Sequence, residues 1–331
     1  MGVTRRFVEA ADLTGLVREA FGTVRRLDQV VRLRGGSKKG VYRLLFDDDS
    51  TAILYVWNEA ENYWPEVAAD LGTGAVDPFA DASDLGLFEA ASEHLGAIGV
   101  RTPRVYLTDR SRRHHPADLA LVEEVHGGTL EALLRRDPEA ARPALTELAA
   151  ALTAMGGRHS ARLGKLTLVD RARQGDPTSE QIVLERALRD LESAATRVQR
   201  LANVRERLAD TLRGWSAVVP PRTGYGLIHG ELGPDHVLLD DRGRPVLIDI
   251  EGLMYFDQEW EHAFLELRFG EHYHWLRGSD LDEDRLRFYR LAMHLSLVAG
   301  PLRLLDGDFP DRELMAGIAE HNTGRILRLL G

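Results

Sequence analysis

Hydrophobic positions follow two different periods along the chain. In the first third, apolar residues recur at every second position in short runs separated by glycine and aspartate turns, which is the pattern of half-buried strands. Three such runs lie in residues 28–57, and two more lie in 102–109 and 117–128. They predict a small antiparallel sheet, accompanied by amphipathic helices at residues 5–25 and 84–99.

The rest of the chain is patterned at the helical period. Residues 129 to 215 and 257–331 carry apolar positions three and four residues apart, with short polar interruptions. A sheet-rich first third followed by a helical remainder predicts an α+β protein of two lobes. We place the N-lobe at 1–121, a hinge at 122–127 and the C-lobe at 128–331, and we expect the ligand site in the cleft between the lobes.

Composition narrows the classes of function. The 331 residues are 44% hydrophobic and 28% charged, with a net charge of -10 and no cysteine. These values argue against a nucleic-acid binder and exclude disulfides, thiolate metal sites and a thiol nucleophile. No apolar run of membrane-spanning length and no secretion signal is visible. We therefore expect a cytoplasmic protein, a monomer or homodimer, whose partner is a small molecule rather than a nucleic acid or a membrane.

One stretch, residues 225–252, places ionisable side chains between apolar runs that are suited to burial. Two of these runs flank a short polar segment that predicts a tight hairpin turn. If the turn is centred between Arg242 and Gly243, His236 pairs with Asp249 and their Cα atoms lie roughly 4.5 to 5.5 Å apart. The motif thus predicts that several charged groups converge at one end of a buried hairpin.

Charged groups beside buried strands need a cation, each other or a polar ligand. Mg²⁺ prefers oxygen ligands from one or two carboxylates together with phosphate, which makes Asp249 the main candidate metal ligand. Glu231 is the candidate that orients or deprotonates an attacking hydroxyl, and His229 is expected to brace the loop. A network of satisfied turn residues without catalytic function is the alternative.

The motif resembles the catalytic loop and metal-binding segment of the aminoglycoside phosphotransferase and choline-kinase-like family, small-molecule kinases of the protein-kinase-like fold. The catalytic loop is HGELGPDH at 229–236, and the metal segment is DIE at 249–251. The resemblance implies ATP, or GTP in its place, as phosphoryl donor, Mg²⁺ as cofactor and a hydroxyl of a polar small molecule as acceptor. The residues that it implies are Glu231 and His229 for catalysis, and Asp249, His236 and Glu251 for the metal.

The resemblance extends over nearly the whole chain and implies a nucleotide site in the N-lobe. The glycine turn before residue 40 is similar to the turn that covers the phosphates, and residues 122–127 are similar to the hinge that holds adenine. A glutamate in the helix at 84–99 resembles the one that pairs with the ATP-contacting lysine. The nucleotide-binding residues implied are Gly35, Gly36, Ser37, Lys38, Lys39, Glu89, Glu123 and Val125.

Three positions depart from the family pattern. Glu231 stands where the family has Asp, His236 stands where it has a metal-binding Asn, and Tyr55 or a neighbour stands where a strand lysine contacts ATP. The phosphate charge would then be met by Lys38 or Lys39. These departures leave a second hypothesis open, a nucleotide- or ligand-binding pseudokinase, and a third in which AMP is transferred.

The segment after the motif bears on the acceptor. It carries acidic side chains among aromatic ones, and in the family such acids hold cationic aminoglycosides, which would make this an antibiotic-resistance or self-protection enzyme. A solvated helix face over core aromatics is the alternative. One of the acids falls where the family has an Asp that braces the catalytic loop, and that residue is Glu261. The full set is Asp257, Glu259, Glu261, Glu266 and Glu271.

Overall fold

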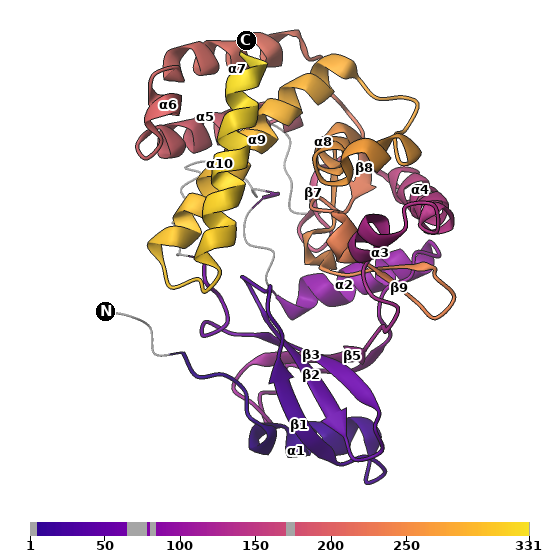
Figure 1. Cartoon of the computed structure of the whole chain (residues 1–331). Coiled ribbons are helices and arrows are strands. Elements are labelled where there is room, and N and C mark those ends of the chain that lie inside the picture. The colour runs from indigo at the N-terminus through magenta and orange to yellow at the C-terminus, as the bar shows by residue number, and fades with distance from the viewer. Residues whose placement is uncertain (1–4, 65–77, 80–83, 170–175, 331) are drawn as a thin grey trace.

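The structure is a computed structural model of the chain, and it describes residues 5–64, 78–79, 84–169 and 176–330. Within these residues the chain forms an N-lobe built on one antiparallel sheet and a mainly helical C-lobe (Figure 1). The predicted α+β class and the two-lobe arrangement are confirmed.

The N-lobe sheet has five strands in the order β1-β2-β3-β5-β4. All neighbouring strands are antiparallel, and the first three are consecutive in the chain, as the runs in 28–57 predicted. The first helix is shorter than the predicted 5–25. The elements are α1 (Ala10–Phe21), β1 (Leu27–Arg32), β2 (Gly40–Phe46), β3 (Thr51–Trp57), α2 (Leu85–Ala97), β4 (Val105–Asp109) and β5 (Asp118–Glu123).

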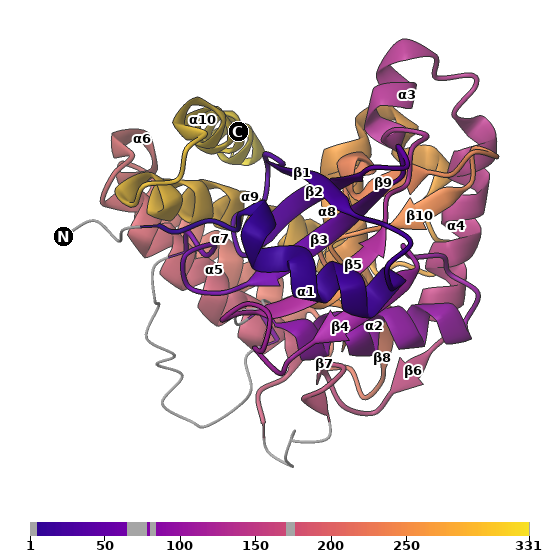
Figure 2. The same ribbon diagram turned by 90° about the horizontal axis from the view of Figure 1, so that it is seen from below.

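Strand alternation divides this sheet into two faces. Tyr42 and Leu44 of β2 and Leu54 of β3 pack with α1 in one buried cluster, and Figure 2 shows α1 lying across that face. Tyr55 and Trp57 of β3 belong to a second cluster, which includes α2 and the beginning of the C-lobe. Each buried face stabilises the lobe through its apolar area, and the second face also joins the two lobes.

The C-lobe consists of helices around a few short strands. A second apolar core packs α5, α7, α8, α9 and α10 together. A four-stranded sheet in the order β6-β8-β11-β7 and the β9–β10 hairpin carry the segments of the motif. The elements are α3 (Leu130–Arg136), α4 (Arg142–Gly156), β6 (His159–Ser160), β7 (Gly164–Lys165), α5 (Ser179–Ala195), α6 (Gln199–Ala202), α7 (Arg205–Val218), β8 (Tyr225–Ile228), η2 (Pro234–His236), β9 (Val237–Leu239), β10 (Pro245–Leu247), η3 (Ile250–Gly252), β11 (Met254–Phe256), α8 (Gln258–Phe269), η4 (Gly270–Trp275), α9 (Glu283–Asp306) and α10 (Arg312–Leu329).

The segment after β3 connects the N-lobe to α9 and α10. Tyr63 packs edge-on against Phe309 in a small buried cluster. Arg5 binds Asp308 through two nitrogen–oxygen contacts of 2.7 Å. The lobes are thus in contact on the side of the helical pair as well as along the chain connection. In the part of the chain that the structure describes, no helix is long and apolar enough to cross a membrane.

Candidate active site

A buried carboxylate of α8 holds the loop that follows β8. Residues 229–236 leave the short sheet after Ile228, which pairs with Met254 of β11. Glu261, only 2% exposed, accepts a hydrogen bond from the backbone N–H of Gly230 at 2.6 Å. Burial raises the pKa of Glu261 to about 7, and the backbone N–H groups of the loop oppose this shift. Glu261 therefore positions the loop.

His229 links the loop to the hairpin that follows. Its ring is fully buried, and Nε2–H donates to the carbonyl oxygen of Ile248 at 3.0 Å. Because a carbonyl only accepts, Nε2 carries the proton. Burial and the neighbouring ring of His236 lower the pKa of His229 to about 4, so the ring is neutral at pH 7. A buried neutral ring with this bond acts as a brace.

The β9–β10 hairpin has a register one residue different from the predicted one. Val237 pairs with Leu247. His236 therefore lies opposite Ile248, whose N–H donates to the His236 carbonyl oxygen at 3.0 Å, and not opposite Asp249. The predicted pairing of His236 with Asp249 is wrong by one position.

The turn explains this difference. Gly243 adopts a left-handed conformation with φ +74°, and the N–H of Asp240 donates to the carbonyl oxygen of Arg244 at 3.0 Å. The loop is therefore three residues long, a form that ends in a left-handed glycine, and not the two-residue turn on which the prediction rested. One added loop residue shifts every cross-strand pair by one.

Asp249 turns out of the strand direction directly after β10. Its backbone lies in the left-handed region, with φ 59° and ψ 42°, which Asp tolerates better than most side chains. The side chain is 45% exposed, whereas Glu251 is 5% exposed. Both carboxylates reach one ammonium group: Lys39 Nζ lies 2.8 Å from Asp249 Oδ1 and is hydrogen-bonded to Glu251. An N-lobe lysine thus contacts the metal segment of the C-lobe.

Strand alternation brings Lys39 to this place. Lys39 comes one residue before β2, and its side chain points to the same side as that of Val41, whose cross-strand partner is Tyr55. Its Nζ lies 4.8 Å from the centre of the Tyr55 ring, within cation–π range. The positive charge that a lysine of β3 would have supplied therefore comes from Lys39, directly before β2.

The charges of this cluster support one another. Burial lowers the pKa of Lys39, but Asp249 and Glu251 together raise it above its ordinary value. The Lys39 ammonium in turn holds the pKa of Asp249 well below its usual range. Burial raises the pKa of Glu251, against the effect of Lys39. At pH 7 the cluster therefore contains a charged lysine and a charged Asp249.

His236 lies beside these groups without binding them. Its Nδ1–H donates to the carbonyl oxygen of Glu231 at 2.8 Å, and Nε2 is 3.9 Å from both Asp249 and Asp235. Asp235 accepts a hydrogen bond from Arg268 at 2.7 Å. The side chain of Glu231 is exposed, so its carboxylate is accessible to an acceptor hydroxyl.

The glycine turn before β2 closes tightly and is attached to the segment after β3. Gly35 has φ +115°, and a Cβ at Gly36 would lie 2.3 Å from a backbone oxygen of the same turn. The Nε1–H of Trp64 donates to Ser37 Oγ at 3.0 Å, and Lys38 Nζ is 5.6 Å from the Trp64 ring centre. Lys38 is thus directed to Trp64, whereas Lys39 is directed to Asp249 and Glu251.

Three predicted nucleotide-binding residues lie away from the lysine. Glu89 binds Arg110 on the N-lobe surface, and the structure does not form the predicted pair between Glu89 and the phosphate-side lysine. The reason is that Lys39 already has two carboxylate partners from the C-lobe. Glu123 accepts from Arg101 at 2.8 Å at the end of β5. Val125 is half-buried in the segment after β5.

Most of the acidic side chains in the segment after the motif form hydrogen bonds or ion pairs inside the protein. Asp257 is fully buried and lies 2.5 Å from Arg285. Glu259 is 1% exposed and binds both terminal nitrogens of Arg222, at 2.6 and 2.7 Å. Glu271 is exposed. The segment therefore offers neither a row of free carboxylates to a cationic substrate nor a solvated helix face, because most of its acids are buried and paired. The remaining two are Glu266, 2.5 Å from Arg290, and Glu261 on Gly230.

Sequence reasoning missed two features of the site. It did not decide between Lys38 and Lys39, although the alternation of β2 already assigns Lys39 to the face opposite Tyr42. It also overlooked Arg268, which fixes Asp235 and comes from the last turn of α8. No local signal marks Arg268, since its partner is far away in the sequence.

The oxygen pair of the metal segment fits a cation, but the wider donor set does not. Asp249 and Glu251 share the Lys39 ammonium, so their oxygens lie within reach of one positive charge. His236 is a nitrogen donor, which Mg²⁺ disfavours. Across the described ranges, no group of three His, Cys, Asp or Glu side chains is arranged to hold a metal ion. Metal binding at the pair would require Lys39 to release it.

A sheet-based N-lobe and a helical C-lobe, with a braced catalytic-type loop and a lysine–carboxylate cluster where the lobes meet, are the features of a protein-kinase-like fold. A family model described as the phosphotransferase enzyme family matches residues 29–265. The chain belongs to this family. No curated protein matches the sequence.

Solved structures agree with this fold. Spectinomycin phosphotransferase APH(9)-Ia, solved with ADP and spectinomycin, has a TM-score of 0.65 at 12% identity and covers 98% of this chain and 99% of its own. Aminoglycoside phosphotransferase APH(4)-Ia has a TM-score of 0.60 at 17% identity, covering 95% and 98%. A fructosamine-3-kinase candidate from Thermobifida fusca has a TM-score of 0.54 at 19% identity, covering 96% and 98%. At these identities the likeness establishes the protein-kinase-like fold.

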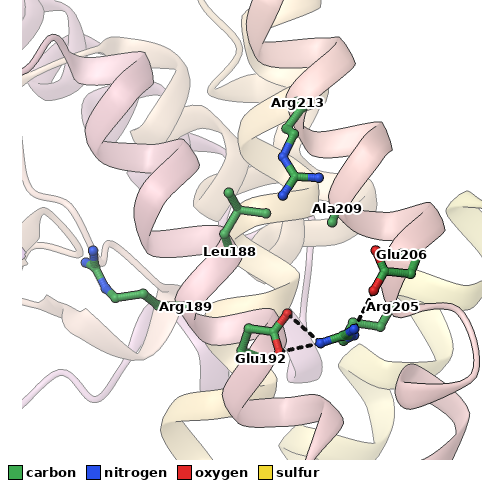
Figure 3. Close-up of a pocket in the computed structure, with 7 residues that line it drawn as sticks. All are labelled: Leu188, Arg189, Glu192, Arg205, Glu206, Ala209 and Arg213. Carbon is green, nitrogen blue, oxygen red and sulfur yellow. Dashed lines mark hydrogen bonds and ion pairs between the residues drawn. The ribbon is translucent and has the colours of Figure 1, made fainter.

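A pocket elsewhere on the C-lobe takes no part in this arrangement. It has a volume of about 520 Å³ and lies between α5 and α7. Figure 3 shows Arg205 at its edge, bound to Glu192 at 2.9 Å and to Glu206. Arg205, Glu192 and Glu206 thus have partners on the protein surface, and we assign no function to this pocket.

Proposed function

We propose that this protein transfers the γ-phosphoryl group of ATP, or of GTP, to a hydroxyl group of a polar small molecule. The observation that carries the proposal is the ion pair between Lys39, at the end of the glycine turn, and Asp249 of the metal segment. The exposed carboxylate of Glu231 in the preceding loop adds a group that could meet an acceptor. Family membership supports the reaction class. Solved neighbours with ADP, AMP-PNP or GDP support a nucleotide as donor.

The proposed reaction divides its tasks among few groups. The acceptor oxygen attacks the γ-phosphorus, the bond from that phosphorus to the β–γ bridging oxygen breaks, and the nucleoside diphosphate leaves. Glu231 orients the acceptor hydroxyl and takes its proton. Lys39 balances charge on the phosphate oxygens, as phosphoryl transfer depends mainly on positioning and charge neutralisation. Glu261 and His229 hold the loop that carries Glu231.

Asp249 and Glu251 are the proposed holders of a divalent cation. When bound there, Mg²⁺ would supply electrostatic stabilisation to the phosphate oxygens. The side chain of Asp249 is the more exposed of the two and the better placed to meet a ligand. In this proposal His236 hydrogen-bonds to the loop backbone and does not bind the metal.

The partners of the acidic residues in α8 bear on the charge of the acceptor. The carboxylates of α8 that could hold a polycation are bound to arginines or to the loop backbone, so we propose a neutral or weakly charged acceptor. An antibiotic of this kind would make the protein a resistance or self-protection enzyme. We further propose that it acts in the cytoplasm as a monomer or homodimer.

A product-mass screen tests the proposal. Aminoglycosides, aminocyclitols, nucleoside antibiotics, sugars and amino alcohols would be incubated with ATP or GTP and Mg²⁺. We expect acceptor-dependent release of nucleoside diphosphate and a product heavier by one phosphoryl group, with both lost in Asp249→Ala. A product heavier by an AMP group would replace phosphoryl transfer by nucleotidyl transfer, and full activity of Asp249→Ala would contradict the proposed site.

A nucleotide-binding protein without transfer activity is the second candidate. One observation favours it: Lys39 occupies both carboxylates of the metal segment, beside a histidine where the family has a metal-binding Asn. Nucleotide binding that is unaffected by EDTA, with no product across the acceptor panel, would support this candidate over the enzyme.

A further inference from the structure

Lys39 acts as the resident cation of the metal segment. Its ammonium is shared by Asp249 and Glu251, and only 8% of the residue is exposed. The cation–π contact with Tyr55 adds a third favourable interaction on another side. A buried ammonium with two carboxylates and an aromatic ring is a filled cation site.

A divalent cation and Lys39 compete for the same oxygens. Mg²⁺ binds carboxylate oxygens at about 2.0 to 2.1 Å, and Nζ already lies 2.8 Å from Asp249 Oδ1. Two positive charges this close repel each other strongly in a partly buried site. Lys39 must therefore leave Asp249 before the carboxylate pair can bind metal.

Lys39 has one other negative partner within the proposed site. It ends the turn that covers the nucleotide phosphates, and its side chain is a point charge on a flexible four-carbon stem. The neighbouring lysine takes another direction, because Lys38 Nζ lies 5.6 Å from the centre of the Trp64 ring. When the Lys39 ammonium leaves the two carboxylates, the phosphate oxygens of the nucleotide are therefore its next binding partner.

We infer that Lys39 exchanges between the Asp249–Glu251 pair and the nucleotide phosphates, and that this exchange couples metal binding to nucleotide binding. Without nucleotide, Lys39 keeps the pair closed to metal. With nucleotide, Lys39 moves to phosphate and the pair opens. Coupling between two ligands is reciprocal, so each ligand improves the affinity of the other by the same factor. The inference rests on the proposed nucleotide site, but not on phosphoryl transfer itself.

Metal binding in the absence of nucleotide tests the competition. Free Mn²⁺ would be measured by electron paramagnetic resonance in titrations of the full chain. We expect Lys39→Met to bind Mn²⁺ about tenfold more tightly than the wild type, within the usual range of coupling between sites. Lys38→Met is the matched control and should keep the wild-type affinity. If Lys39→Met binds Mn²⁺ no more tightly than the wild type, or Lys38→Met gains as much, the inference is overturned.

A second measurement uses the unaltered protein, in case Lys39→Met folds poorly. The chain has three lysines, Lys38, Lys39 and Lys165, so ¹⁵N-labelled lysine yields only three side-chain ammonium signals. We expect Lys39 to show couplings through its hydrogen bonds to carboxyl carbons of Asp249 and Glu251 when only Mg²⁺ is present, and to lose them when AMP-PNP is added. Persistence of these couplings in the ternary complex would overturn the exchange.

The two tests separate this inference from the proposed function. If Lys39→Met binds Mn²⁺ more tightly and no phosphorylated product is found, the exchange is supported and phosphoryl transfer is contradicted. If a phosphorylated product is found and all variants bind Mn²⁺ equally, phosphoryl transfer is supported and the exchange is contradicted.

Discussion

The acidic residues of α8 and those of the motif lie close together in the sequence but have opposite fates. Asp257, Glu259 and Glu261 are at most 2% exposed, and each is bound by a buried or half-buried arginine or by a backbone N–H. Asp249 and Glu231 keep exposed carboxylates. Buried acids with partners inside the protein hold the fold, whereas acids with exposed oxygens are available to a ligand.

The largest effect should come from breaking a buried ion pair. Arg285 is fully buried against Asp257, so Arg285→Met removes the nearer of the two arginines beside this buried carboxylate and should lower the free energy of unfolding by about 3 to 5 kcal/mol. Urea denaturation measures this loss. Arg213→Met is the control, because Arg213 is 58% exposed and pairs with Asp210 on the surface; it should cost less than about 1 kcal/mol. An equal loss of stability in both variants would contradict the proposed difference between buried and exposed ion pairs.

Asp249→Ala should affect activity rather than folding. We expect the rate of phosphoryl transfer to fall by on the order of 10²- to 10³-fold, equivalent to about 3 to 4 kcal/mol, as for other charge-stabilising groups. Steady-state release of nucleoside diphosphate measures the rate. Asp241→Ala, in the exposed turn of the same hairpin, is the control and should retain full activity. A larger loss of stability than of activity would class Asp249 with the structural acids.

Glu261 should make stability depend on pH. Burial raises its pKa to about 7 in the folded protein, from an ordinary value of 4.5. Between these pH values the folded protein keeps a proton that the unfolded chain has lost, so stability falls as pH rises from about 4.5 to 7. At roughly 1.4 kcal/mol per pKa unit, the wild type should lose up to about 3 kcal/mol relative to Glu261→Gln.

Urea denaturation of both proteins at pH 5 and pH 8 measures this difference. Glu266→Gln is the control, because Glu266 lies on the same helix and its side chain is 39% exposed. Its stability difference from the wild type should be the same at both pH values. Parallel profiles for Glu261→Gln and the wild type would show that the Gly230 bond, and not burial, controls this carboxyl group.

Glu231→Asp should have the smallest effect. Shortening the side chain by one methylene moves the carboxylate by about 1 Å, and such displacements change catalytic rates by roughly 10- to 100-fold. The stability should stay within about 0.5 kcal/mol of the wild type, because Glu231 is exposed. Measuring kcat and KM separately tests the role. Unchanged kcat would mean that Glu231 does not act on the acceptor.

Much of the fold follows from local patterns. The period-two runs predicted the strands β1 to β5, and the helical periods predicted the helices of the C-lobe. The motif also indicated where the catalytic-type loop begins. The hairpin register was wrong because a single glycine, Gly243, can end either a two- or a three-residue turn, and composition does not distinguish the two.

The sequence by itself determined two lobes and a catalytic-type loop, because strand and helix periods are local properties, but it left Lys38 and Lys39 as alternatives. Only the tertiary structure decided which partners the charges have. Lys39 meets Asp249 and Glu251, and Arg285 meets Asp257, through pairs separated by 210, 212 and 28 residues. Burial and charge pairing depend on distances in space. The distances from Lys39 to Asp249 and Glu251 are set when the two lobes pack against each other, and the distance from Arg285 to Asp257 is set by the packing of α8 and α9 within the C-lobe.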